Sequence, residues 1–221
     1  ILSHTIPSRE LADLPIPIVT IEREDQFVSS INTDNYMGGY QAASLLAKHD
    51  CDILLHINSP TDPKIPSYGR IQGFLDCCRE QNLRHEMIFR EFGHSYETVQ
   101  PLLQKIIEEL EQKYHGQKKG IFVSNDTHAN TFLNLLFRTY GRLPDDYLLV
   151  GFDNSPISRE AVIPTSTVGQ QIDKIAYEAV SLLVEQMNER KKRRPAPLRE
   201  PVHKVIAPKV FRRATTEQEQ P

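Results

Sequence analysis

The chain has 221 residues, of which 39% are hydrophobic and 25% are charged, as in an ordinary globular protein with one large domain or two small ones. Lys and Arg number 26 against 29 Asp and Glu, a formal net charge of -3, whereas a domain that binds nucleic acid on its own normally carries a basic excess. No apolar run approaches the roughly 18 residues of a membrane span, and the N-terminus shows no signal-peptide pattern.

Short apolar runs alternate with longer amphipathic stretches along the chain. The runs predict strands at 16–21, 28–31, 53–57, 87–89, 120–124 and 147–152, and the amphipathic stretches predict helices at 35–48, 69–82, 96–114, 127–140 and 171–189. In the last helix, apolar residues recur every three or four positions, which indicates one buried face. This alternation is typical of βαβ units, so the predicted fold class is α/β, with parallel strands and helices on both faces of the sheet.

Three segments interrupt the alternation. Residues 58–66 form a Pro-rich loop, and residues 155–170 contain only a short strand or turn. Residues 187–208 include the basic run 191–194, for which a solvated loop after a helix is favoured over a nucleic-acid patch. A last strand-like run follows at 202–211, and the residues from Thr215 onward are expected to be frayed.

Common catalytic and phosphate-binding motifs are missing from the sequence. There is no G-x-x-x-x-G-K-[ST], G-x-G-x-x-G or G-x-S-x-G segment, and the eight histidines include no H-E-x-x-H. We therefore predict no catalytic residues, no metal ligands and no cofactor. The three cysteines form no C-x-x-C pair, and their odd number favours a reducing cytoplasm over a disulfide framework. Cys77 and Cys78 are expected to be packed in a core.

Five ordered segments carry most of the functional information. They read INTDNxxGG at 31–39, GRIQGF at 69–74, FVSND at 122–126, VGFDN at 150–154 and TSTVGQ at 165–170. In order and spacing they resemble the effector-binding core of the LacI/GalR family of bacterial transcription regulators. The ending PKVFRRAT at 208–215 resembles the closing strand of that family, so the resemblance extends over residues 1–215.

The resemblance implies two Rossmann-like lobes joined by three crossover strands, as in periplasmic sugar-binding proteins. The first lobe would comprise 1–33 and 171–202, the second 34–170 and 203–215, with a disordered tail at 216–221. The crossovers would lie at Asp34 and Asn35, at Gln170, and near 202–205. Because Ile1-Leu2-Ser3 reads as the end of a strand without its preceding half, the first lobe is expected to be incomplete at its N-terminus.

The resemblance also implies a ligand site between the lobes, since α/β sheets bind ligands beyond the carboxyl ends of their strands. The expected ligand-binding residues are Asp34, Tyr68, Arg70, Phe92, Asn125, Asp153 and Gln170. Arg70 offers a planar fork of five donors, and Asp153 can accept two hydroxyls. Asn125 both donates and accepts, while Tyr68 and Phe92 are candidates for stacking. Such a set suits a small polyol or a nucleobase.

Simpler structural roles are open for several of these residues. Asp34 and Asp126 precede helical runs and can serve as N-caps. Asn125 can end a strand in a turn, and Arg70 can form a surface ion pair. Asp153 has the strongest functional case, because it follows apolar residues at the carboxyl end of a predicted central strand.

The sequence thus predicts the effector-sensing, dimerising core of a LacI/GalR-type regulator. A sugar or sugar derivative would bind between the lobes and control operator DNA binding through an N-terminal headpiece that is not in this sequence. The expected partners are this effector, operator DNA and a second copy of the chain, with no membrane. Three alternatives are open: a solute-binding protein of the same fold, an α/β enzyme acting on sugars or nucleotides, and a family member that answers to a phosphorylated partner protein.

Overall fold

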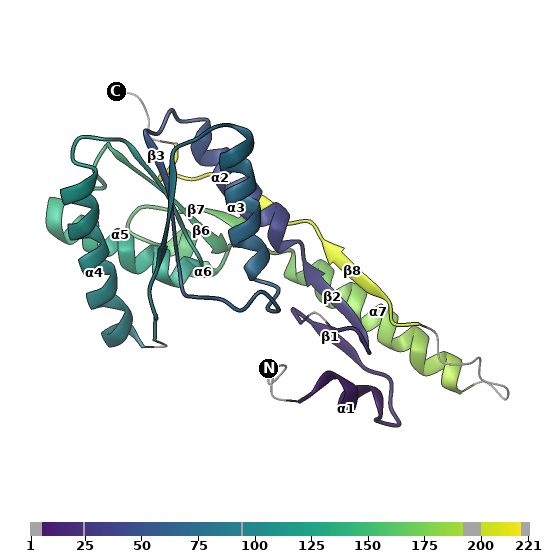
Figure 1. The fold of residues 1–221 in the computed structure, drawn as a ribbon. Helices are drawn as coiled ribbons and strands as arrows, with labels where there is room; N and C mark the ends of the chain where they lie inside the picture. Colours follow the sequence, from purple (N-terminus) through teal and green to yellow (C-terminus); the bar gives the residue numbers. More distant parts are fainter. Residues whose placement is uncertain (1–5, 24, 94, 192–199, 218–221) are drawn as a thin grey trace.

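The computed structural model describes residues 6–23, 25–93, 95–191 and 200–217 (Figure 1). They form two separate sheets. A three-stranded sheet has the strand order β1-β2-β8, and a six-stranded sheet has the order β4-β3-β5-β6-β7-β9. The strands alternate with helices along the chain, which confirms the predicted α/β class. We call the two parts the small lobe and the large lobe.

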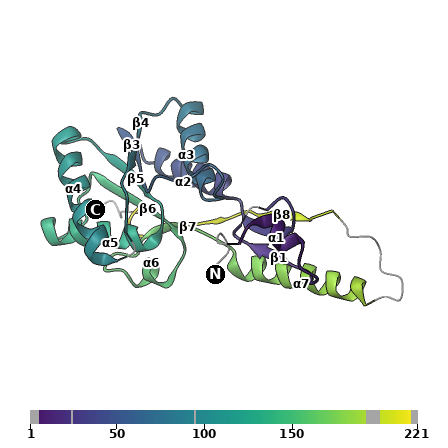
Figure 2. The ribbon, with the colours of Figure 1, turned by 60° about the horizontal axis from the view of Figure 1, so that its bottom comes forward.

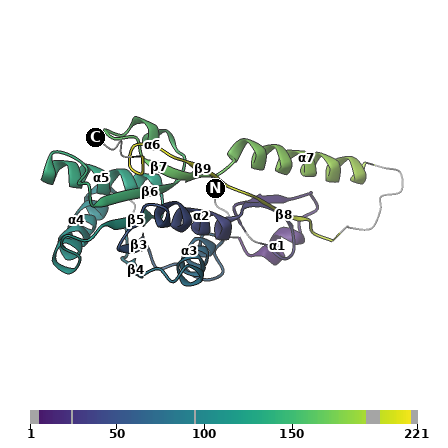
Figure 3. The same ribbon diagram turned by 90° about the horizontal axis from the view of Figure 1, so that it is seen from above.

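The small lobe is built from two segments that are far apart in the sequence. Its elements are α1 (Ser8–Ala12), β1 (Val19–Ile21), β2 (Ser29–Thr33), α7 (Ile172–Arg190) and β8 (His203–Ile206). Its three strands are parallel. One face of α7 packs on the sheet through Ile175, Ala179 and Leu182, as the periodic spacing predicts. Figure 3 shows α7 on one side of this sheet and α1 on the other.

The large lobe has a sheet covered on both faces. Its strands are β3 (Ile53–Asn58), β4 (His85–Phe89), β5 (Lys119–Val123), β6 (Tyr147–Asp153), β7 (Ser166–Gly169) and β9 (Lys209–Phe211). Its helices are α2 (Asn35–Ala47), α3 (Tyr68–Glu80), α4 (Tyr96–Lys113), α5 (Asp126–Tyr140) and α6 (Pro156–Glu160). Alternate residues of β3 enter opposite cores: Ile53, Leu55 and Ile57 pack with α4 and α5, and Leu54 packs with α2 and α3. A sheet buried on both faces explains why its central strands read as continuous apolar runs.

Three segments connect the lobes (Figure 2). The chain passes from β2 to α2, from β7 to α7, and from β8 to β9. Within the described strands, β9 runs antiparallel to β7, whereas the other strand pairs are parallel. Two lobes joined by three crossovers confirm the architecture that the sequence predicts.

The predicted single strand at 202–211 is wrong. Residues His203–Ile206 form β8, which pairs with β2 of the small lobe, and Lys209–Phe211 form β9, which pairs with β7 of the large lobe. Pro208 lies between them and has no backbone N–H to give to a strand ladder. The expected lobe boundary after residue 202 is wrong for the same reason, because the chain leaves the small lobe only after Ile206.

Shorter features also differ from the predictions. Helices α1 and α6 were not predicted, and each is only five residues long. The expected frayed or disordered terminus is wrong for Thr215 and Thr216, which are buried; the Thr216 hydroxyl is hydrogen-bonded to Ser166. The predicted strand end at 1–3, most of the basic run and residues 218–221 lie outside the described residues.

Other expectations concern the cores and the membrane. Cys77 and Cys78 are fully buried, as predicted for packed residues. Across the described parts of the chain, no helix combines the length and the apolar character that crossing a membrane requires.

Candidate functional site

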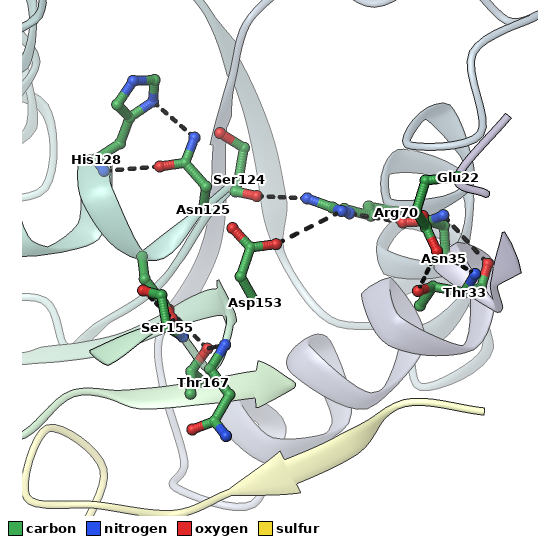
Figure 4. A network of polar contacts seen from close by, with 12 residues as sticks. Glu22, Thr33, Asn35, Arg70, Ser124, Asn125, His128, Asp153, Ser155 and Thr167 are labelled. Carbon is green, nitrogen blue, oxygen red and sulfur yellow. Dashed lines mark hydrogen bonds and ion pairs between the residues drawn. The ribbon is translucent and has the colours of Figure 1, made fainter. Parts of the chain in front are cut away.

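The strongest polar feature at the carboxyl end of the large sheet is a pair of opposite charges (Figure 4). Arg70, in the first turn of α3, directs Nη2 toward Oδ1 of Asp153 at a distance of 3.9 Å. The two side chains are 12% and 37% exposed. Because 3.9 Å exceeds a hydrogen-bond distance, the guanidinium and the carboxylate face each other without a direct hydrogen bond.

Arg70 is held in place from three sides. Its Nε donates to Oδ1 of Asn35 at 2.8 Å, and its Nη1 donates to the carbonyl oxygen of Ser124 at 2.8 Å. The guanidinium carbon lies 3.6 Å from the ring centroid of Phe152, a cation–π distance. Burial lowers the pKa of Arg70, and the nearby Asp153 partly opposes that shift. The alternative of a surface ion pair is therefore wrong for Arg70.

Asp153 ends β6 in an unusual backbone conformation. Its φ is +105°, and the φ of the following Asn154 is +53°. Burial raises the pKa of Asp153 to about 6, although the charge of Arg70 acts in the opposite direction. This carboxyl group is therefore expected to change between its neutral and its ionised form near pH 6.

Asp126 supports the segment that follows Asp153. Its Oδ2 accepts from the backbone N–H and the hydroxyl of Ser155, at 2.8 and 3.1 Å, and its Oδ1 accepts from the hydroxyl of Thr167 at 2.6 Å. The prediction that Asp126 caps α5 is wrong, because Asn125 is the N-cap. The carboxylate of Asp126 instead joins α5, β7 and the turn after β6.

Asn125 contributes to both the helix cap and the site. Its Oδ1 accepts from the backbone N–H of His128 at 2.8 Å, and its amide nitrogen lies 3.2 Å from Nδ1 of His128. The His128 ring in turn packs against Phe92, with 4.9 Å between the ring centroids. Burial lowers the pKa of His128. The structure thus joins two predicted residues, Phe92 and Asn125, through a histidine that the sequence analysis did not select.

The other predicted residues lie at the ends of elements. Asp34 is the N-cap of α2, where its Oδ1 accepts from the N–H of Met37 at 2.9 Å, so its structural alternative is confirmed. Gln170 directly follows β7, whose last residue, Gly169, is paired with Asp153. Tyr68 is the first residue of α3 and is partly buried. Their direct part in ligand binding stays a prediction.

Glu22 is a further candidate for the site, not among the residues predicted from the sequence. It follows β1 with a φ of +52°, and its Oε1 accepts from the N–H and the hydroxyl of Thr33, at 2.6 and 2.7 Å. Its charge acts on both Arg70 and Asp153, and Figure 4 shows it beside Arg70. The small lobe therefore supplies a carboxylate to the same site. A polar residue after a predicted strand is the signal that could have found it.

The side chains of this set offer several hydrogen-bond donors and acceptors. In the described ranges, no group of three or more His, Cys, Asp or Glu residues is placed to hold a metal ion. Around Arg70 the site gathers the carboxylate of Asp153, the charge of Glu22, the amide of Asn35 and the ring of Phe152. Such a set is suited to a small molecule with several hydroxyl groups.

Comparison with known proteins places the chain in a family. The model of the periplasmic binding protein-like domain matches residues 29–216. The ribose operon repressor of Halalkalibacterium halodurans is 26% identical over 186 residues, which cover 84% of this chain and 54% of that protein. The HTH-type transcriptional repressor PurR of Pasteurella multocida is 24% identical over 189 residues, covering 82% of this chain and 53% of that protein. The chain thus spans about half the length of these curated relatives.

Solved structures give the same result. A periplasmic binding protein/LacI transcriptional regulator from Alkaliphilus metalliredigens, complexed with D-xylulofuranose, is 27% identical with a TM-score of 0.72. The match covers 93% of this chain and 72% of that chain. A LacI family transcriptional regulator from Enterococcus faecalis with bound ribose shares the fold at 19% identity, with a TM-score of 0.69, over 96% of this chain and 71% of that one.

Proposed function

Because the chain belongs to the periplasmic binding protein-like domain family, we propose that it is the effector-sensing core of a LacI/GalR-type transcriptional regulator. The effector is a small sugar or sugar derivative that binds between the two lobes. The names of the relatives, which include ribose and sucrose operon repressors, support a role in regulation. The sugars named with two similar structures, D-xylulofuranose and ribose, support the ligand class.

The observation that carries the proposal is the 3.9 Å separation of Arg70 from Asp153. A hydroxyl group can donate one hydrogen bond and accept another. One sugar hydroxyl can therefore donate to the Asp153 carboxylate while it accepts from the Arg70 guanidinium, or two neighbouring hydroxyls can each bind one of the two groups. The ring of Phe92 offers an apolar face against which the carbon side of a sugar can stack. A ligand that lacks a matching hydroxyl would leave a desolvated group unpaired, which costs about 1–3 kcal/mol.

Glu22 gives this site a means of control. A sugar held by Asp153 and Arg70 in the large lobe can also contact the Glu22 carboxylate of the small lobe. Such a ligand binds one relative orientation of the lobes better than another, and it shifts the population toward that orientation by its difference in affinity. Coupling of this kind typically amounts to about 1–3 kcal/mol.

The remaining parts of the proposal concern the whole protein. A DNA-binding segment outside this sequence engages operator DNA in the cytoplasm, and two copies of the chain present two such segments to the half-sites. The protein acts as a switch and not as an enzyme. Several relatives are named HTH-type regulators, and the segment matched here covers only about half of each, which supports a DNA-binding part elsewhere in the protein.

Thermal denaturation with a panel of compounds tests the proposal. The panel contains D-ribose, D-xylulose, sucrose, cellobiose, ribose 5-phosphate, ribitol and adenosine. A ligand at 100 times its Kd stabilises a protein by about 2.7 kcal/mol, which raises the Tm of a chain of this size by roughly 5–10 °C. We expect one class of sugar to raise the Tm.

Two variants locate the binding. Asp153→Asn removes the charge at the carboxyl end of β6 and should abolish the Tm rise. Asp145→Asn removes the same charge just before β6, where Asp145 is 77% exposed, and should keep the rise. Cooperative unfolding without a Tm rise for any compound contradicts sugar sensing. An equal rise in wild type and Asp153→Asn contradicts the site.

A further inference from the structure

The turn after β6 is strained at two consecutive residues. Asp153 and Asn154 both have positive φ, at +105° and +53°. Residues with a Cβ adopt this region rarely, because the Cβ approaches the backbone. Such a backbone conformation is kept only where contacts with neighbouring residues compensate for its energetic cost. The contacts that hold this turn therefore also hold the proposed ligand carboxylate of Asp153.

Three side chains hold the turn after Asp153. The hydroxyl oxygen of Thr167 accepts from the N–H of Asn154 at 3.3 Å. Asp126 holds the backbone N–H of Ser155. The side chain of Asn154 itself is fixed by Arg213, whose Nη2 donates to Oδ1 of Asn154 at 2.6 Å. This last contact is the shortest of the three.

Arg213 links the turn after β6 to neighbouring segments, and we call its side-chain contacts with Asn154, Thr165 and Ser158 the clamp. Its Nη1 donates to the carbonyl oxygen of Thr165 at 2.8 Å and to the hydroxyl of Ser158 at 3.2 Å. Its backbone N–H donates to Oγ of Ser166 at 2.7 Å. One guanidinium thus joins the turn after β6 to the start of β7. The planar fork of arginine can make these contacts together, whereas lysine carries a single donor group.

We propose that Arg213 is a positioning residue for the effector site: by fixing Asn154 in its left-handed conformation, it holds the Asp153 carboxylate toward Arg70. The inference rests on the proposed role of Asp153 in ligand binding. It adds a residue that acts on the ligand through the backbone of the turn. Arg213 lies just after β9, the strand that follows the third crossover, so the clamp also ties the site to a connection between the lobes.

Substitutions at Asn154 test the clamp without touching Arg213. Asn154→Ala and Asn154→Gly both remove the acceptor for the Arg213 side chain. Alanine keeps the steric cost of positive φ, whereas glycine adopts it freely. If the clamp serves to hold this conformation, Asn154→Ala should impair the site more than Asn154→Gly. If the hydrogen bond matters for another reason, the two variants should be equally impaired.

Substitutions of Arg213 complete the design. We expect Arg213→Met to impair the site and the double variant Arg213→Met with Asn154→Gly to recover most of the loss. Arg212→Met is the matched control, because Arg212 is exposed and carries the same charge one residue earlier. A purely electrostatic effect of Arg213 on Asp153 would not be rescued by glycine at position 154.

Two readouts separate this inference from the proposed function. The first needs no ligand: amide hydrogen exchange over residues 152–156, together with the pKa of the Asp153 carboxyl measured by NMR. Arg213→Met and Asn154→Ala should speed exchange at least tenfold and shift that pKa, because the carboxyl changes both its burial and its distance from Arg70, and Arg212→Met should change neither. The second is the Kd for D-ribose by calorimetry, which should rise at least tenfold in the impaired variants and recover in the double variant.

The outcomes are distinct. Failure of D-ribose to bind the wild type counts against that sugar as effector, while hydrogen exchange and the Asp153 pKa still test the clamp. Unchanged exchange and an unchanged pKa in Arg213→Met overturn the positioning role. Equal impairment of the double variant and Arg213→Met overturns it as well.

Discussion

Gly39 on α2 lies against the carbonyl group of Arg70 on α3: a Cβ at Gly39 would be 2.0 Å from that oxygen. Gly73 approaches the carbonyl oxygen of Tyr36 in the same way, with a corresponding distance of 1.9 Å. Contacts this short exclude any side chain at either glycine. The two glycines therefore set the separation of α2 and α3, and with it the point from which the Arg70 side chain extends.

Gly39→Ala should displace Arg70, because the new methyl group has to push α3 away from α2. We expect the free energy of unfolding to fall by about 1–3 kcal/mol and the Kd for the bound sugar to rise about tenfold, a loss of about 1.4 kcal/mol in binding. Denaturant titration and calorimetry measure the two effects. Gly141→Ala is the control, since Gly141 at the end of α5 has a φ of +71° and open space around it. The control should lose stability without a change in Kd; a parallel change in both variants would contradict the positioning of Arg70.

Binding should depend on pH through Asp153, whose pKa burial raises to about 6. The ionised carboxylate is the better acceptor for sugar hydroxyls, so affinity should rise with pH through about 6 and level off above about 7. At about pH 5 it should be about tenfold weaker than on that plateau. The groups whose charges act on Asp153 are Arg70, Asp126 and Glu22. Calorimetric titrations at pH 5, 6, 7 and 8 measure the profile. Asp153→Asn should show no measurable binding at any of these pH values, and binding by that variant with an unchanged pH profile would assign the pH dependence to another group.

The same shift affects the stability of the ligand-free protein with the opposite sign. Because the folded carboxyl of Asp153 binds its proton more tightly than the unfolded one, its contribution to stability is fully present below the ordinary pKa of about 4. It is lost as the pH rises through about 6. Denaturant titrations of wild type and Asp153→Asn over this interval should therefore converge at low pH and diverge as the pH approaches 6. Parallel curves would show that the folded pKa is not raised.

Two substitutions of Asn125 can separate its role as the N-cap of α5 from its proposed contact with the ligand. Asn125→Ala removes the cap of α5 and should cost about 0.5–2 kcal/mol of stability. Asn125→Ser keeps a side-chain oxygen for the N–H of His128 and should keep most of that stability. We expect the Kd for the bound sugar to rise at least fivefold in both variants. Binding by Asn125→Ser at the wild-type level would leave Asn125 with the structural role alone.

A buried ion pair at the opposite end of the sheet should affect stability alone. Lys119 is fully buried, and its Nζ lies 2.5 Å from Oδ2 of Asp146, which is 37% exposed. Asp146→Ala leaves the buried ammonium group with the Gln117 carbonyl oxygen but without its counter-charge, and should cost about 2–3 kcal/mol. Lys119→Met leaves only a partly exposed carboxylate and should cost about 1 kcal/mol. Denaturant titration ranks the two variants, and the Kd for sugar should stay within twofold in both. An equal loss in the free energy of unfolding for the two variants would contradict the prediction that loss of Asp146 costs more than loss of Lys119.

The central strands of the large lobe could be predicted from the sequence because each contains a run of mostly apolar residues. β3, β5 and β6 are buried on both faces, so their runs stand out from the polar segments around them. β7 could not be predicted in this way. Its Ser166 and Thr167 are polar but fully buried, and their hydroxyls bond to Arg213 and Asp126, which lie 47 and 41 residues away. Hydrogen bonds over such separations leave no local pattern.

The candidate site also contains residues that a local sequence pattern can predict and residues whose roles depend on distant parts of the chain. Asp153 could be predicted because a carboxylate at the carboxyl end of a buried strand is conspicuous, and Arg70 because its motif is specific. Asp126 was misassigned, because its partners Ser155 and Thr167 come from other elements. Glu22 directly follows the predicted strand at 16–21, but no local pattern shows that its charge acts on Arg70 and Asp153 of the other lobe. The contribution of the small lobe therefore emerges only in three dimensions.

The placement of β9 has a consequence for how the protein is made. Lys209–Phe211 covers the free edge of β7, and Thr215 accepts from the N–H of Ser166 and donates to the carbonyl oxygen of Leu149. During synthesis, β3 to β7 emerge from the ribosome well before these partners, which follow only after α7 and β8 have been made. Until β9 has been synthesised, one edge of β7 in the nascent large lobe has no partner strand. Such an exposed edge can pair with strands of other chains. The pairing of β9 with β7 therefore completes the sheet and also removes the exposed edge at which the nascent chain can aggregate.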